Sequence, residues 1–108
     1  VLVNLLTNAS HAVVHKDESW VRVTAEAVEQ RVEIRVTDCG KGIPMAIVEK
    51  IFNPFFTTKK KNKGTGLGLA ICKKIAQRHG GDIYVDHDVP NTCFVFTLPL
   101  FQGIALSL

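Results

Sequence analysis

This chain of 108 residues lacks several features that mark other classes of protein. No apolar run approaches the roughly 20 residues that a helix needs to span a bilayer, and no secretory signal pattern is present. The cysteines Cys39, Cys72 and Cys93 are odd in number, widely spaced and without a Cys-x-x-Cys pair. They therefore predict neither a disulfide scaffold nor a metal site, and they fit a reducing compartment.

Charged residues are also few, at 21% of the chain, whereas 46% of the residues are hydrophobic. This balance favours a folded globule over a disordered tail, and the length suits one domain with one core. Much of the net charge of +3 comes from Lys59, Lys60, Lys61 and Lys63. This lysine run could be a solvated loop, a phosphate clamp or a nucleic-acid patch. The last is the weakest interpretation, because no aromatic residue interrupts the run.

The spacing of apolar residues predicts three helices and four strands. Recurrence at three and four residues marks the helices, and alternation marks the strands. The first two strands form a predicted hairpin with one buried face, joined by the tight connection Glu29–Gln30. The helices are predicted at residues 1–14, 46–52 and 67–79, and the strands at 20–28, 32–37, 83–87 and 93–98.

The remaining segments bound the predicted domain. Residues 57–66 are polar and without periodicity, which predicts a flexible loop. Residues 101–108 form an apolar tail to which we assign no element, so the domain is predicted at residues 1–100. Val1 already lies inside an apolar helical pattern, and we expect the parent protein to extend upstream of it.

An acidic residue and two alternate glycines, Asp38, Gly40 and Gly42, end the second strand. A carboxylate there can accept a hydrogen bond from an exocyclic amine such as that of adenine, and its site rejects a base without the amine. The glycines let the backbone turn sharply and approach a flat ring. Taken alone, the pattern is more often an Asx turn that leaves a strand.

Three alternate glycines, Gly64, Gly66 and Gly68, open the last helix. Their backbone N–H groups and the helix N-terminus suit phosphate oxygens. A dinucleotide-binding turn would need a strand directly before it, and a polar loop stands there instead. A flexible linker is the plain alternative, but Leu67 and Leu69 between the glycines favour an anchored turn.

Two amides and three aromatic residues complete the pattern. Asn4 and Asn8 lie one helical turn apart on an otherwise apolar helix, and an amide oxygen is a hard ligand suited to Mg²⁺. For either residue alone, a buried or capping amide is the plainer interpretation. Phe52, Phe55 and Phe56 could anchor a lid or belong to the core.

Together these segments resemble the catalytic ATP-binding domain of sensor histidine kinases, within the ATPase superfamily that includes gyrase, Hsp90 and MutL. The wording Pro-Phe-Phe-Thr-Thr-Lys is similar to that of the nitrogen-regulation type. The resemblance covers residues 1–100, and four ordered boxes make it specific. They are the N box at residues 4–9, the first glycine box at 38–43, the F box at 52–59 and the second glycine box at 64–69.

The resemblance implies a site for Mg-ATP, in which Asp38 holds the adenine amine and Asn8 binds Mg²⁺. The F box and the stretch up to Gly64 would form a lid. Catalytic roles are implied for Asn4, Asn8 and Lys59. The implied nucleotide-binding residues are Asn8, His11, Asp38, Gly40, Gly42, Ile43, Phe52, Phe56, Thr57, Thr58, Lys59, Gly64, Thr65, Gly66, Leu67, Gly68, Leu69 and Thr92.

The sequence departs from the pattern of the resembled family at two places near this site. His11 stands where the family frequently carries Lys, and Pro90–Asn91 replaces a glycine-rich turn before Thr92.

The implied fold is α/β (α+β), a two-layer sandwich of the Bergerat type with a mixed sheet and helices on one face, truncated at its N-terminus. The implied function is to bind Mg-ATP and donate its γ-phosphoryl group to a histidine on a separate dimerisation domain of the same parent kinase. That domain would pass the group to a response regulator. We expect a cytoplasmic location, which includes the cytoplasmic part of a membrane-bound sensor, and neither nucleic-acid binding nor direct membrane contact.

Three alternatives stay open: a hydrolytic ATPase of the same superfamily, a serine kinase of the anti-sigma type, and a non-catalytic nucleotide-binding module. Position 4 bears on the first two. In the hydrolytic relatives a Glu four residues before the Mg²⁺-binding Asn activates water, and here that residue is Asn4. A neutral amide takes no proton at neutral pH, so general-base help of roughly 10²–10⁴-fold is lacking. We therefore expect slow hydrolysis and no phosphorylation of serine.

Overall fold

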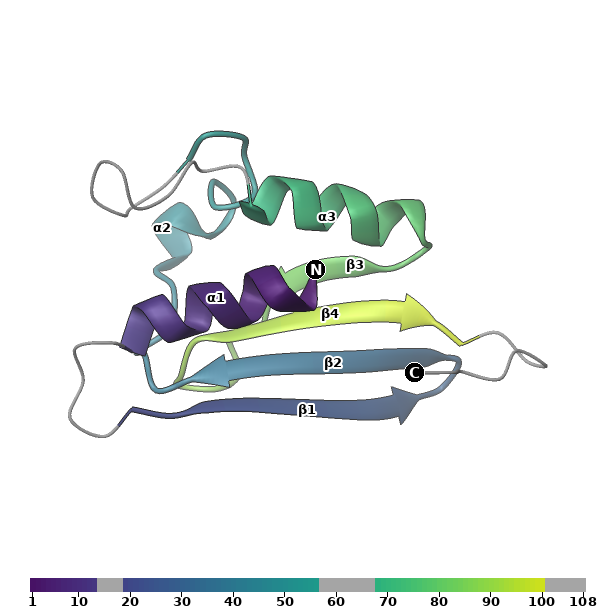
Figure 1. The fold of residues 1–108 in the computed structure, drawn as a ribbon, viewed down its shortest axis with the longest axis horizontal. Helices are drawn as coiled ribbons and strands as arrows, with labels where there is room; N and C mark the ends of the chain where they lie inside the picture. Colours follow the sequence, from purple (N-terminus) through teal and green to yellow (C-terminus); the bar gives the residue numbers. More distant parts are fainter. Residues whose placement is uncertain (14–18, 57–67, 101–108) are drawn as a thin grey trace.

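Helices and strands follow one another in the order α1-β1-β2-α2-α3-β3-β4. The computed structural model describes residues 1–13, 19–56 and 68–100, and the helices lie on one face of a four-stranded sheet (Figure 1). The predicted two-layer sandwich is thereby confirmed. The elements are α1 (Leu2–Val13), β1 (Val21–Val28), β2 (Arg31–Asp38), α2 (Met45–Val48), α3 (Gly68–Arg78), β3 (Asp82–Val85) and β4 (Cys93–Pro99).

The strands lie in the order β1-β2-β4-β3, and each neighbouring pair is antiparallel. The prediction of a mixed sheet is therefore wrong for the described residues. β2 and β3 run in the same direction, because the chain returns through α2 and α3. However, β4 lies between them and pairs with both, so the two parallel strands form no ladder with each other.

The β1–β2 hairpin forms where predicted, with Val28 opposite Arg31 across a two-residue turn. Its predicted buried face exists only on β2, where Val36 and Asp38 are 2% and 3% exposed. All eight residues of β1 are exposed, so the prediction is wrong for this strand. β1 is an edge strand, and α1 packs mainly on β2 beside it.

The core lies between the helices and the sheet. α1 contributes Leu5 and Ala9, and α3 contributes Cys72 and Ala76, each at most 4% exposed. Burying a large apolar side chain contributes about 1.5–3 kcal/mol, so these contacts hold both helices on the sheet. The sheet side of the cluster consists of Val36, Ile83, Phe94 and Phe96.

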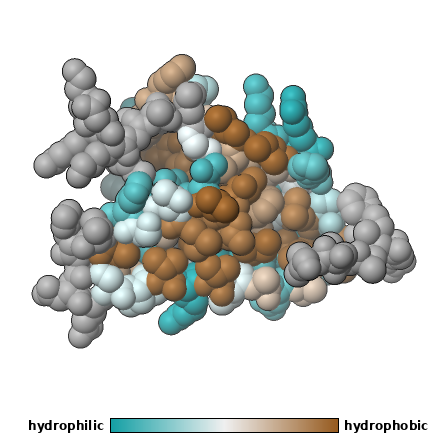
Figure 2. All heavy atoms as spheres, viewed as in Figure 1, coloured by the Kyte–Doolittle hydropathy of each residue, from teal (hydrophilic) through white to brown (hydrophobic). Residues whose placement is uncertain are grey.

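α3 begins and ends within one residue of its predicted bounds and is followed by Gly80 in the left-handed conformation, with φ of 81°. A glycine in this conformation commonly ends a helix. The apolar residues of α3 are buried only in part, because Ile71 and Ile75 are 49% and 38% exposed. Figure 2 shows apolar residues gathered across the middle of the face of the molecule that is seen in Figure 1.

α2 is shorter than the predicted helix at residues 46–52. It begins directly after Pro44, a residue suited to a helix start, and ends at Val48. The chain continues as hydrogen-bonded turns, with the Lys50 N–H donating to the Ile47 carbonyl at 2.9 Å.

Within the described ranges, no helix is long and apolar enough to cross a membrane.

Candidate functional site

Asp38 ends β2 on the face of the sheet that the helices cover. Side chains two residues apart along a strand share a face, and Val36 lies in the core on the helix side. Asp38 is 3% exposed, and its Oδ1 accepts a hydrogen bond from the Gly40 N–H at 2.7 Å. The Asx turn offered by the sequence therefore forms, and it fixes a buried carboxylate at the end of the sheet.

Thr92 joins this turn to the start of β4. Its backbone carbonyl accepts the Asp38 N–H at 3.0 Å, and its own N–H donates to the Gly40 carbonyl at 3.3 Å. Its Oγ1 accepts the Gly42 N–H at 3.1 Å. The predicted site residue Thr92 thus holds the glycine turn from across the sheet. The neighbouring Asn91 adds a side-chain hydrogen bond to the Gly40 carbonyl at 3.3 Å.

The structure explains why glycine stands at both positions of the turn. A Cβ on Gly40 would lie 2.7 Å from Asp38 Oδ1 and 2.7 Å from Thr92 Oγ1, which is too close for any side chain. Gly42 has a φ of 91°, a conformation that L-residues with a Cβ rarely adopt. The turn therefore keeps its backbone bare beside the buried carboxylate.

Four half-buried apolar side chains among the predicted site residues pack against the core cluster. They are Ile43, Phe52, Phe56 and Leu69. Phe52 meets the Phe94 ring of β4 edge to face, with ring centroids 6.4 Å apart. A buried carboxylate acceptor beside bare backbone suits a flat, amine-bearing ring.

Phe55 differs from the other phenylalanines. It is 73% exposed and has a positive φ of 68°, which is costly for a bulky residue. The interpretation of these aromatic residues as core residues therefore applies to Phe52 and Phe56 but not to Phe55.

The predicted amides lie on α1, which packs on β2 and α3. The Asn4 Nδ2 donates to the Cys72 Sγ of α3 at 3.3 Å, so Asn4 helps to join the two helices. Asn8 follows one turn later and is half-buried, while His11 is exposed in the last turn. Asn8 thus lies one turn along the helix from the α1–α3 contact.

Several predicted site residues lie outside the described residues. They are Thr57, Thr58, Lys59, Gly64, Thr65, Gly66 and Leu67. Gly68, the last glycine of its box, is the first residue of α3. Within the described ranges, no group of three or more His, Cys, Asp or Glu side chains could hold a metal ion. A magnesium ion would therefore depend on few protein ligands, such as Asn8, together with phosphate and water.

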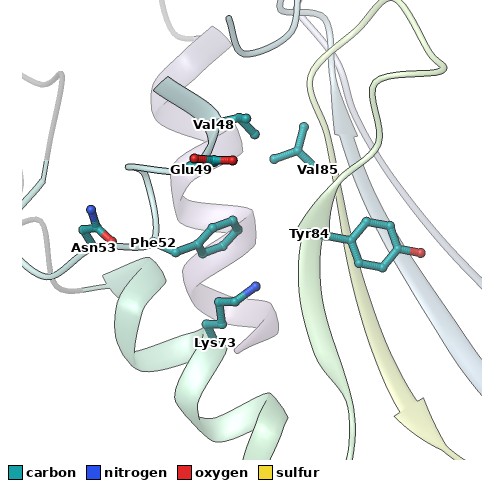
Figure 3. Close-up of a pocket in the computed structure, with 7 residues that line it drawn as sticks. All are labelled: Val48, Glu49, Phe52, Asn53, Lys73, Tyr84 and Val85. Carbon is teal, nitrogen blue, oxygen red and sulfur yellow. The ribbon is translucent and has the colours of Figure 1, made fainter. Parts of the chain in front are cut away.

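Sequence reasoning missed a hollow of about 470 Å³ that Phe52 lines (Figure 3). Its lining comes from α2 and the following turn, from α3 and from β3. The Lys73 Nζ lies 4.6 Å from the centre of the Phe52 ring, a contact between residues 21 positions apart that no local pattern reveals. The lining residues are Val48, Glu49, Phe52, Asn53, Lys73, Tyr84 and Val85.

Comparison with known proteins gives a family match and many similar sequences. Residues 1–102 match the family described as histidine kinase-, DNA gyrase B- and HSP90-like ATPase. The chain is 40% identical over 105 residues to the two-component sensor PprA of Pseudomonas aeruginosa. This alignment covers 93% of this chain and 11% of PprA. It is 42% identical over 101 residues to the sensor histidine kinase ZraS of Escherichia coli K12, in an alignment that covers 93% of this chain and 21% of ZraS.

Solved structures with the same fold include histidine kinase catalytic domains. The nucleotide-free catalytic domain of histidine kinase ThkA has a TM-score of 0.77 and 40% identity, covering 91% of this chain and 62% of that one. ThkA in complex with the response regulator protein TrrA has a TM-score of 0.71 and 35% identity, covering 93% of this chain and 27% of that one. Full-length ShkA in complex with AMPPNP has a TM-score of 0.73 and 32% identity, covering 96% of this chain and 22% of that one.

These matches cover nearly the whole of this chain but only 11% and 21% of the two full-length relatives. The shared fold and the buried Asp38 turn agree with the sequence match. The chain belongs to the histidine kinase-, DNA gyrase B- and HSP90-like ATPase family, and it is homologous to the catalytic domains of sensor histidine kinases.

Proposed function

We propose that this domain binds Mg-ATP between its helices and the sheet and presents the γ-phosphoryl group to a histidine on a separate dimerisation domain. The observation that carries the proposal is the Asp38 carboxylate, 3% exposed and fixed by the Gly40 N–H. A buried carboxylate beside a bare glycine turn is suited to accept the exocyclic amine of adenine.

The other roles follow the position of each residue. The half-buried Ile43, Phe52 and Leu69 would flank the adenine, and Asn8 on α1 would supply one oxygen to Mg²⁺. Mg²⁺, when bound, would neutralise charge on the phosphates. The residues of the F box and second glycine box outside the described ranges would cover the phosphates, with Lys59 among them.

Catalysis by this domain would consist mainly of positioning and charge neutralisation. Asn4 is a neutral amide that donates to Cys72 at 3.3 Å, so it can orient a neighbour but cannot take a proton from water. This favours transfer to a histidine, which brings its own nucleophilic nitrogen, over hydrolysis. It also disfavours a serine kinase, because a serine hydroxyl must lose its proton to a base.

The partners we propose are a histidine-containing dimerisation domain and a response regulator receiver domain. One similar protein, ThkA, has been solved with the response regulator protein TrrA, which supports the second partner. Another, full-length ShkA, has been solved with AMPPNP, which supports the nucleotide site.

The test is phosphotransfer in trans. The chain, γ-³²P-ATP and Mg²⁺ are mixed with a histidine-containing dimerisation domain, and label on that domain should be acid-labile and base-stable. Asn8→Ala should reduce the labelling rate while circular dichroism stays unchanged, because one hard oxygen ligand is lost. Rapid steady-state hydrolysis by the isolated chain, without labelled histidine, would favour the ATPase instead.

A further inference from the structure

The outer edge of β3 combines open backbone groups with the hollow shown in Figure 3. The Asp86 N–H donates to the Cys93 carbonyl at 3.0 Å, which fixes how the residues alternate along the antiparallel pair. Residues 84 and 86 turn their N–H and C=O groups toward β4. Ile83 and Val85 consequently turn theirs away from the sheet.

Side chains form hydrogen bonds with the outward-facing N–H and C=O groups of Ile83 but not with those of Val85. The Ile83 carbonyl accepts the Lys73 Nζ at 2.9 Å, and the Ile83 N–H donates to Asp82 Oδ1 at 2.8 Å. A lysine placed on an edge in this way prevents further strand pairing. The N–H and C=O of Val85 make no hydrogen bond within the described part of the chain, so one residue of the edge is open.

The open residue borders the hollow. Figure 3 shows the side chains of Val48, Phe52 and Val85 directed toward one another, whereas the Tyr84 ring points away. A strand added at Val85 would pair one of its residues with Val85. That residue would place its side chain on the same face as Val85, in the hollow.

The charges around the hollow are unequal. The Lys73 ammonium is compensated, because Asp82 Oδ1 lies 3.1 Å away and the Phe52 ring lies 4.6 Å away. Glu49 is exposed, and its carboxylate forms no ion pair with any described residue. Among the described residues that line the hollow, the uncompensated charge is therefore negative, which favours a cation on the occupant.

We propose that the edge of β3 and the Phe52 hollow form a docking site for an extended peptide segment of a partner protein. The segment pairs with the backbone of Val85, inserts one apolar side chain between Val48 and Phe52, and directs a Lys or Arg toward Glu49. This combination of strand addition and side-chain pocket is a recurring mode of peptide recognition.

The test uses a defined probe, the peptide acetyl-Lys-Leu-Lys-Val-Lys-amide, titrated into the ¹⁵N-labelled chain without nucleotide. The amide resonances of Val48, Glu49, Phe52 and Val85 should shift, and those of Asp38 and Gly40 should not. The same peptide with N-methylleucine lacks the N–H that pairs with the Val85 carbonyl, so it should bind at least about tenfold more weakly.

Charge is tested by a pair of matched variants. Glu49→Gln should weaken peptide binding by about two- to fivefold, as expected for an exposed ion pair. Glu26→Gln removes another exposed acid, from β1, and should leave the affinity unchanged. Equal binding of the N-methylated peptide, equal effects of both variants, or shifts confined to β1 would overturn the proposal. Self-association through β3, detected by sedimentation as a concentration-dependent dimer, would assign the edge to a second copy instead.

Discussion

Individual residues fix the geometry of the Asp38 turn. The Gly40 N–H donates to Asp38 Oδ1 at 2.7 Å, and Thr92 Oγ1 accepts from Gly42 at 3.1 Å. Gly40 is required because a Cβ there would lie 2.7 Å from both oxygens, and Gly42 because its φ is 91°. The turn should therefore be intolerant of the smallest added group.

Gly40→Ala is expected to impair both stability and nucleotide binding. Its Cβ would lie 2.7 Å from two oxygens, so Asp38 and Thr92 must move, with a loss of about 1–3 kcal/mol in the free energy of unfolding and tenfold or more in ATP affinity. Gly68→Ala is the control for stability, because no described atom lies within 4 Å of its added Cβ. Denaturant unfolding should show a loss for the first variant and none for the second. Equal unfolding midpoints would contradict the geometry.

At this scale the sequence predicted the type of residue better than its contacts. Asp38, Gly40 and Gly42 could be predicted because a strand end and a sharp turn are local patterns. Thr92 could be placed only through the family resemblance. The hydrogen bonds from Asn91 to Gly40 and from Asn4 to Cys72 join residues 51 and 68 positions apart. Such pairs follow from the packing of strands and helices, which spacing alone does not specify.

Among the elements, the β1–β2 hairpin carries a strained turn. Glu29, the first residue of the turn, has a φ of 57°, a conformation that costs a residue with a Cβ roughly 1–2 kcal/mol. Turns of two residues prefer glycine or asparagine at such positions. The hairpin therefore forms despite its turn residue, and the cross-strand pairs must stabilise it.

Glu29→Gly is accordingly expected to raise the free energy of unfolding by about 0.5–1 kcal/mol. Gln30→Gly is a matched control, because Gln30 has no positive φ, and glycine there should lower stability by a similar amount. Thermal unfolding followed by circular dichroism distinguishes the two variants. If both variants lowered the melting temperature, the left-handed conformation of Glu29 would be contradicted.

The helix-free face of the sheet carries an ion pair between elements. Arg35 of β2 contacts Asp86, directly after β3, at 2.5 Å, and Glu33 at 3.5 Å. The hydrogen bond from Arg35 lowers the pKa of the Asp86 carboxyl, assisted by the Asp88 N–H. The same contact raises the pKa of the Arg35 guanidinium. The pair therefore stabilises the fold only while Asp86 is ionised.

Arg35→Gln is expected to lower the free energy of unfolding by about 1 kcal/mol at neutral pH, since both groups are partly exposed. The folded-state pKa of Asp86 lies below its unfolded value, so this stabilisation is present above about pH 4 and is lost as the pH falls through the folded-state value. In urea titrations the difference from the unmodified chain should shrink as the pH falls below 4. Arg31→Gln, an exposed change on the same strand, controls for arginine loss. A difference independent of pH would contradict the ion pair.

The sequence predicted the existence of these elements better than their burial. Alternation marked β1 correctly, but its predicted buried face is exposed because α1 covers β2. Spacing likewise marked α3, although Ile71 and Ile75 remain exposed. The order β1-β2-β4-β3 could not be predicted from spacing, since β4 inserts between two strands that the chain visits earlier.

For the molecule as a whole, the two layers bring the candidate site to one end of the sheet. β2 ends at Asp38, and the turn before β4 supplies Thr92, while α1 packs on β2 and α3 packs on β3 and β4 (Figure 1). Residues more than 50 positions apart, Asp38 and Thr92, thus meet in one turn around a buried carboxylate. The central claim is that this carboxylate recognises adenine.

Calorimetric titration of the chain and of Asp38→Asn with Mg-ATP and Mg-GTP tests that claim most directly. The unmodified chain should bind ATP and bind GTP poorly, because guanine has a carbonyl in place of the adenine amine. Asp38→Asn should lose tenfold to a thousandfold in ATP affinity, since a buried partner left unpaired costs ~1–3 kcal/mol or more. Equal affinity of the unmodified chain for ATP and GTP, or unchanged ATP affinity in Asp38→Asn, would contradict the account.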